Sequence, residues 1–519
     1  MQAFSYLFFI FKQNSQLQIT CDLFIVDIYY IRVYDIGSKN ISFMVKKKIK
    51  FNPYLLLILA FLGFVLVGSF LLSMPFAFKD NPNNEWCHVG SYLDAFFTSL
   101  ASMTLTGVTT YPEGLANTLS IAGQIIVMIL VQIGGLGIVT FLTFLFTIMR
   151  RKLQFKDRLL ISQAIAFNNY AEIATYVRRL IIITAICEAV GIGLGVPVFA
   201  AMFPNEPLKI IYYSIFHSIS AFNNAGFDLF KGTSSMVYGL DIAGGIAIDS
   251  SNWLYYYCTI YLAVLSLFGG ISFLVIIDIV LGHKPPRRWS SFTKTCLTMT
   301  AGLIIVMSSL LFLTDGIKSD KPMNLFETIL TIINCRTAGF SVYAQEDISL
   351  PGKLICGIMM LIGGSPLSTA GGIKVTTIYL IVLVIISYFR GRRLAPFKRL
   401  YSYNLVAKSM SLVYVVVAFL LLAFFGLVAF GVKDTNGLSE EMKDNLVSAY
   451  LYEVVSCFGN VGFYTGIESR LSVGSRLILC LLMLVGHAGP MTFFQLFQNN
   501  LDKNAIVHYS FVEEDILIG

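Results

Sequence analysis

Four short glycine-containing segments hold the residues whose types and spacing could do chemistry in this chain. Their sequences are Leu105-Thr106-Gly107-Val108, Asn223-Asn224-Ala225-Gly226-Phe227, Arg336-Thr337-Ala338-Gly339-Phe340 and Asn460-Val461-Gly462-Phe463. Each segment follows an apolar run, and the glycines recur at intervals of 113 to 123 residues. A short motif at near-equal intervals indicates an internal fourfold repeat. In lipid, such non-helical backbone is tolerated only where protein buries it or where it lines water.

A ring of backbone carbonyls is the chemistry that four such segments could provide. Carbonyl oxygens that face one axis can replace the hydration shell of a monovalent cation. Glycine accepts positive φ and has no Cβ, so it lets the backbone turn a carbonyl toward the axis. The preceding helices would point their partially negative C-terminal ends at the ion. The residues expected to bind it, largely through backbone, are Thr106, Gly107, Asn224, Ala225, Gly226, Thr337, Ala338, Gly339, Asn460, Val461 and Gly462. Because the segments differ in sequence, we expect a simple filter with one well-formed site.

The composition places these segments in a membrane protein. The chain has 519 residues, 56% of them hydrophobic, and a mean hydropathy of +0.74. A soluble domain of this length would not be so apolar, so we expect a polytopic protein in a lipid bilayer. The net charge of +7 lies mostly in short connectors, which indicates a positive-inside bias and not nucleic-acid binding. The nine cysteines form no CxxC pair in the sequence and are interpreted as apolar filler.

Each repeat is predicted to contain a spanning helix, a short re-entrant pore helix, a filter loop and a second spanning helix. The re-entrant helices are expected at Tyr92–Met103, Ile210–Ala221, Leu325–Asn334 and Leu446–Phe458, too short for the roughly 20 residues that span hydrocarbon. The spanning helices are expected at Tyr54–Phe76, Leu119–Met149, Val177–Met202, Leu254–Leu281, Cys296–Leu313, Leu354–Tyr388, Leu405–Val432 and Val473–Phe497. The predicted fold class is an all-α polytopic membrane protein, with the fourfold repeat arranged around a central pore.

Loop charge predicts the orientation. The repeats are expected at residues 51–150, 151–283, 284–390 and 391–500, between an N-terminal segment (1–50) and a C-terminal tail (501–519). Basic residues concentrate between repeats, as in Arg150-Arg151-Lys152 and Arg287-Arg288. Because cytoplasmic loops carry an excess of Lys and Arg, the connectors and both termini are expected in the cytoplasm. The mixed or acidic segments before the pore helices are expected outside, where they would raise the local cation concentration.

The N-terminal segment has two interpretations. Residues 1–43 contain no uninterrupted apolar run long enough to span a bilayer, and no small-residue signal-peptide cleavage site. Met44 precedes a basic run that ends at Lys50, so it is a candidate for the true initiator. The alternative is a loose amphipathic extension.

A glycine-rich interruption divides the second spanning run of repeat three. It comprises Gly363, Gly364, Ser365, Pro366, Leu367, Ser368, Thr369, Ala370, Gly371, Gly372, Ile373 and Lys374. So many poor helix formers favour a broken helix with an intramembrane loop, which would lie below the filter and could obstruct the pore. We predict that this segment, called the gate loop (363–374) below, gates the pore. Insertion of a lysine at the bilayer centre costs roughly 2.5–3.5 kcal/mol of free energy, so one interpretation is that Lys374 faces the pore interior or a polar partner. The other interpretation is that Lys374 lies near the cytoplasmic interface and snorkels.

These motifs resemble the Trk/Ktr/HKT superfamily of potassium transporters, and most closely its KtrB-type membrane subunit. The matching stretches are Val131 to Ile138, Ser220 to Asp228, Arg336 to Phe340, Gly363 to Lys374, Val485 to Thr492 and Glu513 to Ile516. The resemblance covers about residue 50 to the end, with motifs of all four repeats in order.

The resemblance implies K⁺ uptake across a bacterial cell membrane, dependent on or activated by Na⁺, with K⁺ at the filter and no organic cofactor. It implies a homodimer with a cytoplasmic nucleotide-binding regulatory subunit of the KtrA or TrkA kind. In plant members of the superfamily a serine at the first filter position goes with Na⁺ transport, and here that residue is Gly107.

Two gate residues depart from the family pattern. KtrB-type subunits have arginine at the position of His487, so a neutral histidine there would change gating or its pH dependence. The alternative is a histidine that forms a hydrogen bond between helices. Leu367 replaces a small residue, and it would either plug the gate or only pack.

Other functions remain open within transport. The runners-up are a TrkH-type proton-linked unit and a pore for Na⁺ or for monovalent cations broadly. The sequence has no ATP-binding motif, so the ion would move down its gradient, which supplies about 2.3 kcal/mol per unit charge per 100 mV. An intramembrane enzyme would need paired catalytic groups at membrane depth. Of the acids and histidines, only Glu188, Asp278 and His487 lie in the full spans, without a partner motif, so no enzyme is expected.

Overall fold

The computed structural model describes residues 17–21, 31–35, 53–79, 85–87, 90–111, 113–137, 173–230, 236, 239–242, 244–281, 285–317, 321–336, 338–391, 401–433 and 445–489. Several predictions fall outside these residues. They concern the start at Met44, the basic connector at 150–158, the filter residue Thr337 and the tail at 501–519.

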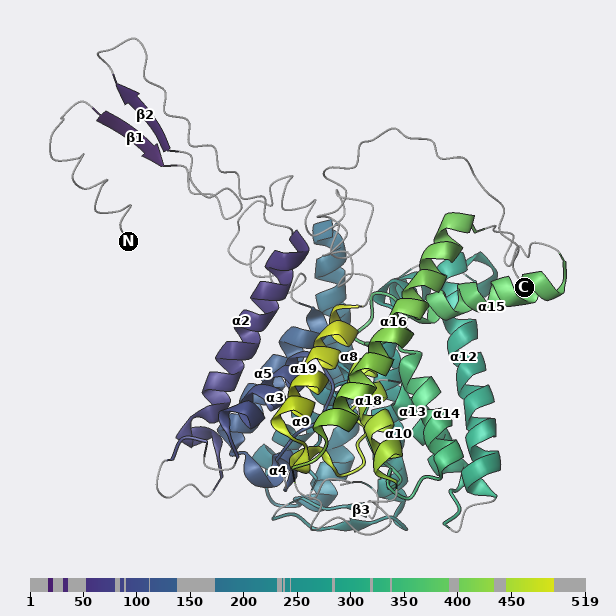
Figure 1. The fold of residues 1–519 in the computed structure, drawn as a ribbon. Helices are drawn as coiled ribbons and strands as arrows, with labels where there is room; N and C mark the ends of the chain where they lie inside the picture. The colour runs from purple at the N-terminus through teal and green to yellow at the C-terminus, as the bar shows by residue number, and fades with distance from the viewer. Residues whose placement is uncertain are drawn as a thin grey trace.

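Most of the framework helices run from the end that carries β3 toward the opposite end, whereas α15 lies crosswise near that opposite end (Figure 1). The framework helices are α2 (Pro53–Ser73), α5 (Ile121–Leu136), α8 (Ile173–Met202), α10 (Trp253–Gly270), α12 (Ser291–Leu311), α14 (Leu350–Leu361), α15 (Val375–Phe389), α16 (Tyr403–Phe430) and α19 (Val473–Ala488). Within the described residues, four helical stretches are long and apolar enough to cross a membrane: Val177–Met202, Trp253–Gly270, Ser291–Gly316 and Leu405–Phe430. The predicted spans Leu119–Met149 and Val473–Phe497 contain α5 and α19, and their last residues, 138–149 and 490–497, lie outside the described part of the chain.

Four further helices match the predicted pore helices and are called the short helices below, while the helices given above are called the long helices whatever their length: α3 (Tyr92–Met103), α9 (Pro207–Phe222), α13 (Leu325–Cys335) and α18 (Leu446–Gly459). All four were predicted, and α3 has the predicted bounds. Capping boxes start two of them, because Ser91 pairs with Asp94 in α3 and Asn324 pairs with Glu327 in α13. Proline at the start of α9 also fits a helix N-terminus, because the first N–H groups of a helix have no partner within it and proline lacks an N–H.

The contacts between helices follow one order around the molecule. Each short helix packs between two long helices of its own predicted repeat: α3 between α2 and α5, α9 between α8 and α10, α13 between α12 and α14, and α18 between α16 and α19. The second long helix of each set also packs against the next short helix, in the pairs α5–α9, α10–α13, α14–α18 and α19–α3. The last pair closes the series onto the first set.

Two spans are broken rather than continuous. The predicted interruption in repeat three is present, since residues 362–374 separate α14 from α15. The expectation of one helix over Leu254–Leu281 was wrong. There, α10 ends at Gly270 and is followed by α11 (Phe273–Ile276) and the π-helical turn η2 (Ile277–Leu281). At the break Ile271 is extended, and the side chain of Ser272 accepts a hydrogen bond from the N–H of Leu274 as a new N-cap.

Short strands qualify the expectation of an all-α chain. β1 (Leu17–Cys21) pairs antiparallel with β2 (Ile31–Asp35), where isoleucine, threonine, valine and tyrosine favour extended backbone. β3 (Gly239–Leu240) pairs with β4 (Ile248–Asp249) in the connector before α10, where each backbone polar group needs a partner. Short turns complete the chain: η1 (Pro75–Ala77), α4 (Gly114–Thr118), η3 (Pro286–Arg288), η4 (Phe312–Gly316) and η6 (Glu468–Arg470). The described fold is therefore mostly helical.

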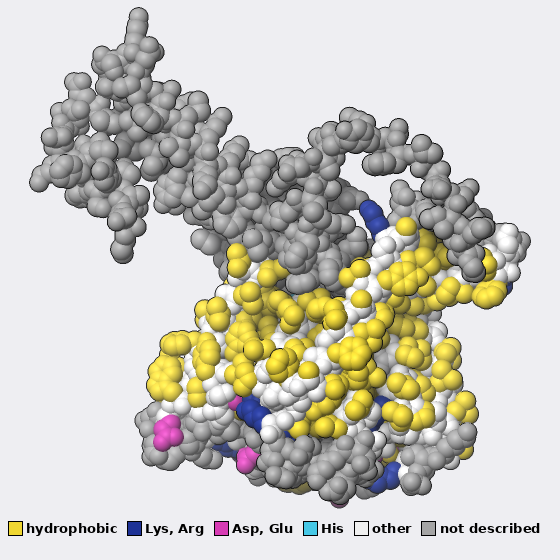
Figure 2. Space-filling model, in the orientation of Figure 1, with side chains coloured by type: hydrophobic (Ala, Val, Ile, Leu, Met, Phe, Trp, Pro, Cys, Tyr) yellow, Lys and Arg dark blue, Asp and Glu magenta, His cyan; other side chains and the backbone are white. Residues whose placement is uncertain are grey.

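The outer surface is apolar over the helices. Figure 2 shows hydrophobic side chains across the face of the long helices, and the visible Asp and Glu side chains lie at the end that carries β3. Exposed apolar residues on α16 and α19 include Leu422, Phe425, Phe430 and Leu477. Large exposed apolar surface on a folded chain fits contact with lipid hydrocarbon. Together with the apolar helices, this surface identifies a multi-pass membrane protein.

Candidate ion-conduction site

The structure brings the four predicted glycine segments together. Gly107, Gly226, Gly339 and Gly462 have φ values of 77°, 69°, 73° and 89°, a region that side chains rarely adopt. A Cβ on each glycine would lie closer than 3.0 Å to a carbonyl oxygen of the next segment. The oxygens belong, in that order, to Ala225, Ala338, Val461 and Thr106. Since the fourth contact returns to the first segment, the four segments form one closed ring.

The ends of the short helices set the backbone of these segments. Leu105, Asn224 and Asn460 are left-handed, with φ values of 60°, 58° and 52°. In the same three segments, the N–H of the residue before the glycine donates to the carbonyl of the residue five positions earlier, as from Thr106 to Ala101 (2.8 Å). This is the Schellman arrangement that ends a helix and satisfies its last carbonyls. In the third segment Ala338 donates instead to Asn334 at 3.0 Å, and Thr337 lies outside the described residues.

Polar side chains on the short helices hold the chain just beyond each glycine. Three residues past the glycine, Thr110 donates to Asp94 (2.7 Å), the N–H of Leu229 donates to His217 Nε2 (3.3 Å), and the N–H of Thr465 donates to Glu453 (2.8 Å). In the third segment Asn334 donates to the carbonyl of Phe340 at 2.7 Å. The sequence interpretation missed these tethers, although ionisable residues within short apolar helices were a signal that could have found them.

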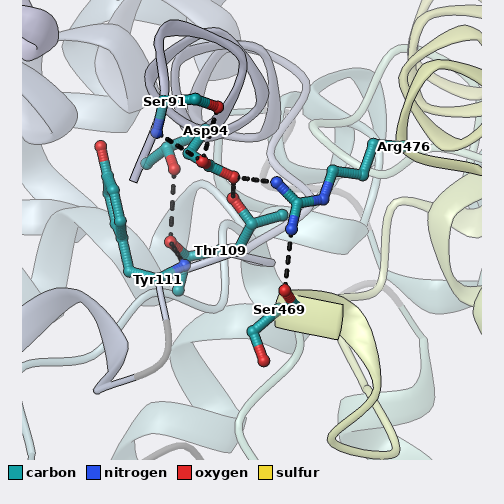
Figure 3. Close-up of polar contacts among 8 residues, drawn as sticks. Ser91, Asp94, Thr109, Tyr111, Ser469 and Arg476 are labelled. Carbon is teal, nitrogen blue, oxygen red and sulfur yellow. Dashed lines mark hydrogen bonds and ion pairs between the residues drawn. The ribbon is translucent and has the colours of Figure 1, made fainter. Parts of the chain in front are cut away.

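The first and fourth segments meet at a buried ion pair. Asp94 at the start of α3 and Arg476 at the start of α19 are 6% and 4% exposed, and Figure 3 shows Nη1 of Arg476 aimed at the carboxylate. Asp94 also accepts from the N–H and Oγ of Ser91 at 2.7 and 2.8 Å, and Arg476 Nη2 donates to the carbonyl of Ser469 at 2.8 Å. Closer to the ring, Asn460 Nδ2 donates to Thr106 Oγ1 at 2.8 Å. These contacts form a polar seam between segments far apart in the sequence.

Packing of glycines brings the second long helices close to the short helices. A Cβ on Gly134, Gly269 or Gly486 would meet the last-turn carbonyl of Met103, Phe222 or Phe458, respectively, at less than 3.0 Å. Small residues at such contacts let the backbones of neighbouring helices approach closely, as is typical of helix packing in membranes.

The predicted gate loop lies against the ring and against the break in repeat two. A Cβ on Gly371 would meet the Asn460 side chain of the fourth segment, and Arg336 of the third donates to the carbonyl of Gly363 at 3.5 Å. On the other side, Ser365 N–H donates to Gly270 O (3.1 Å) and Thr369 Oγ1 to Gly269 O (3.1 Å). The N–H of Phe273 donates to the carbonyl of Leu367 (3.2 Å). The loop thus supplies partners for backbone groups that the break frees.

Within the loop, burial is uneven. The buried residues are Gly363, Gly364, Ser365, Thr369, Ala370, Gly371, Gly372 and Ile373, whereas Pro366, Leu367, Ser368 and Lys374 are half-buried. Leu367 has a φ of 59°, which is unfavourable for a residue with a branched side chain. Its side chain packs at the edge of the core that surrounds α9 and α10. Leu367 is therefore held in a strained conformation by the contacts of its own backbone.

Lys374 and His487 lie with the loop. Lys374 Nζ donates to the carbonyl of Ala370 at 2.5 Å, which favours the interpretation with a polar partner over snorkelling. His487, in the last turn of α19, lies near Phe61, with ring centroids 5.4 Å apart and ring planes tilted by 38°. It also lies within electrostatic reach of Lys374 and hydrogen-bonding reach of the Thr104 backbone. The structure therefore places Lys374 and His487 beside the gate loop, which contacts the ring segments at Gly363 and Gly371.

The described residues hold no cluster of three or more His, Cys, Asp or Glu side chains that could bind a metal ion.

Comparison with known proteins adds the family. Residues 72–509 match the TrkH family, described as a cation transport protein. The chain is 28% identical over 488 residues to the potassium/sodium uptake protein NtpJ of Enterococcus hirae, covering 92% of this chain and 100% of that protein. It is 27% identical over 466 residues to the Ktr system potassium uptake protein B of Bacillus subtilis, covering 88% and 96%.

A solved structure has a similar fold. The potassium transporter TrkH from Vibrio parahaemolyticus aligns with a TM-score of 0.62 at 20% identity, covering 87% of this chain and 85% of that one. These matches agree with the KtrB-like resemblance and with transport rather than enzymatic activity. The chain therefore belongs to the TrkH family of cation transport proteins, within the Trk/Ktr superfamily.

Proposed function

We propose that this chain is the pore-forming subunit of a potassium uptake system, with its four glycine segments as the selectivity filter. The observation that carries the proposal is the closed ring, in which each glycine meets a carbonyl of the next segment. A ring of this kind can gather carbonyl oxygens from four segments around one dehydrated K⁺. The predicted repeats, at 51–150, 151–283, 284–390 and 391–500, then form one quarter of the pore each.

The gate loop is proposed to control passage below the filter. Its contacts with the side chains of Asn460 and Arg336 support this role, because both residues belong to filter segments. Its hydrogen bonds to Gly269, Gly270 and Phe273 would have to break for it to move away. Each is worth about 0.5–1.5 kcal/mol, a scale that binding of a partner protein can supply.

The partners of the proposed pore follow from its relatives. A relative named as a Ktr system potassium uptake protein supports a second subunit, proposed to be a cytoplasmic nucleotide-binding regulator of the KtrA or TrkA kind. A homodimer, cytoplasmic termini and a bacterial cell membrane belong to the same proposal. Na⁺ is proposed as a coupling or activating ion, which the potassium/sodium uptake relative supports. Proton-linked uptake of the TrkH type is the second candidate, supported by the fold of a solved relative.

Expression in a bacterium without its own potassium uptake tests the proposal. Rb⁺ uptake and growth at low K⁺ would be measured with and without Na⁺, and with and without a KtrA-type partner. We expect K⁺-dependent rescue, which requires Na⁺ if the coupling proposal is correct. Rescue that follows the proton gradient instead would favour the second candidate, and no Rb⁺ uptake from well-inserted protein would refute potassium transport.

A matched pair of glycine variants tests the filter assignment. Gly107→Ser puts a Cβ against the carbonyl of Ala225, whereas Gly302→Ser on α12 enters open space, with nothing within 4 Å. We expect Gly107→Ser to weaken Rb⁺ uptake and raise Na⁺ permeation, while Gly302→Ser keeps the parent's selectivity. Equal selectivity in both variants would contradict a filter role for Gly107.

A further inference from the structure

Two glutamates meet behind the fourth filter segment. Glu453 lies on α18 and is 0% exposed, and Glu468 lies in the η6 turn and is 5% exposed. Their carboxyl groups are within hydrogen-bonding reach of each other. Neither residue belongs to the predicted filter or gate. The equivalent place behind the first filter segment holds the Asp94–Arg476 ion pair instead, so the fourth segment has a different kind of support.

One carboxyl oxygen of Glu453 accepts two hydrogen bonds. Its Oε1 accepts from the backbone N–H of Thr465 at 2.8 Å and from Thr465 Oγ1 at 3.0 Å. Thr465 is three residues past Gly462, so this contact fixes the outer end of the fourth filter segment. The second oxygen, Oε2, and Oε1 of Glu468 have no donor among the described residues, although both atoms are buried. A buried carboxyl oxygen without a donor is costly unless a proton lies on it or next to it.

Among the residues that the structure describes, no cation compensates the two carboxylates. The titratable side chains in electrostatic reach of the pair are Tyr452, Cys457 and Tyr464, which are acids and carry no positive charge. Arg476 directs Nη1 to Asp94 and Nη2 to the carbonyl of Ser469. Arg470 follows in the same turn and is half-buried toward the surface. Two ionised carboxylates in contact would repel strongly at this site, because the interior screens charge poorly.

We propose that Glu453 and Glu468 share one proton and form a proton-binding site that holds the outer end of the fourth filter segment in place. The shared proton lies between Oε2 of Glu453 and Oε1 of Glu468, and gives both atoms a hydrogen-bond partner. Loss of the proton at alkaline pH leaves two carboxylates in contact, which pushes Glu453 off Thr465 and loosens the segment around Gly462. Cation permeation then falls as the external pH rises.

Glutamine at position 453 imitates the protonated state. In Glu453→Gln the amide oxygen still accepts from Thr465, and the amide NH₂ donates permanently to Glu468. Glu468→Gln also removes the conflict, because the amide that it introduces can donate to an ionised Glu453. The matched control is Glu346→Gln, since Glu346 is an exposed glutamate in a connector outside the pair.

Infrared spectroscopy of the full-length protein in lipid nanodiscs tests the proton directly. At neutral pH we expect the parent to show a protonated-carboxyl absorption that disappears in Glu453→Gln and in Glu468→Gln and persists in Glu346→Gln. Titration to alkaline pH should remove the same absorption from the parent. An unchanged absorption in both pair variants would overturn the proposal, since no proton would then reside on the pair.

The transport readout rests on the proposed potassium uptake. Rb⁺ uptake, normalised to each variant's own value at neutral pH, should fall with rising pH in the parent and in Glu346→Gln, and lose that fall in Glu453→Gln. An unaltered fall in Glu453→Gln would refute the link between the pair and the filter. If the parent takes up no Rb⁺ at any pH, the proposed function fails, and the infrared titration still decides whether the pair binds a proton.

Discussion

The buried pair between Asp94 and Arg476 offers the sharpest test of how the ring is held. Asp94→Asn leaves Arg476 buried, with one carbonyl partner at Ser469 and an Nε that has no partner among the described residues. Asparagine also replaces one acceptor by a donor, and Asp94 accepts from Ser91, Thr110 and Arg476 at once. Breaking a buried pair from one side costs about 3–5 kcal/mol. We expect about 4 kcal/mol here, because both charges are nearly inaccessible to water.

A second ion pair provides the matched control. Lys321 and Asp347 lie 2.7 Å apart, but their side chains are 67% and 26% exposed. Exposed pairs contribute about 0–1 kcal/mol, so Asp347→Asn should change the free energy of unfolding very little. Both variants would be unfolded by SDS titration in bicelles, and Rb⁺ and Na⁺ uptake would be measured in cells.

The double variant separates the charge from the geometry. Asp94→Asn combined with Arg476→Gln leaves no buried charge, so it should lose less stability than the sum of the two single changes. If the free energies of unfolding of Asp94→Asn and Asp347→Asn differ by less than about 1 kcal/mol, the Asp94–Arg476 pair does not hold the seam, and the reasoning from burial is refuted.

Two further predictions concern the gate loop and the carboxyl pair. Gly371→Ala pushes a methyl group into the Asn460 side chain, so it should destabilise the protein by about 1–3 kcal/mol and alter Rb⁺ uptake. The control is Gly357→Ala on α14, which should do neither, because nothing lies within 4 Å of the added methyl group. Equal effects of the two variants would contradict the contact between the gate loop and the fourth glycine segment. Burial raises the pKa of Glu468 above its ordinary value of 4.5, so the folded state binds more protons than the unfolded state from about that pH up to the raised pKa. The free energy of unfolding should therefore decrease as pH rises through this window, and Glu468→Gln should flatten the decrease; a slope that is unchanged in SDS titrations at several pH values would argue against the raised pKa.

Much of the helical framework could be predicted from local sequence. The short helix at Tyr92–Met103 has the predicted bounds, because an apolar run between a Ser91 cap and a glycine break defines both of its ends. The interruption before Val375 was also predictable, since glycine, proline and serine oppose a helix wherever it packs. The apolar run from Leu254 to Leu281 lacks such residues in number, so the break after Gly270 could not be recognised from local sequence.

Contacts between distant residues account for the rest. Asp94 and Arg476 are 382 residues apart, and nothing local to either one selects the other. Leu105 takes a left-handed conformation that its residue type opposes, because the Schellman arrangement and the neighbouring segments fix it there. The glycine spacing indicated four related segments, but only the three-dimensional contacts reveal that each one meets the next in chain order.

For the proposed selectivity filter, the closed order of the glycine contacts also has a consequence for how ion preference evolves. In a ring of four identical subunits, one substitution alters four places at once, so its effects are large and symmetric. Here each segment is encoded separately, and a substitution at Ala225 or Val461 changes only one quarter of the circle while its two neighbours keep their contacts. If this circle is the proposed selectivity filter, selection can adjust it in small, uneven steps, and a lineage can pass from one preferred ion to another through intermediates that still conduct.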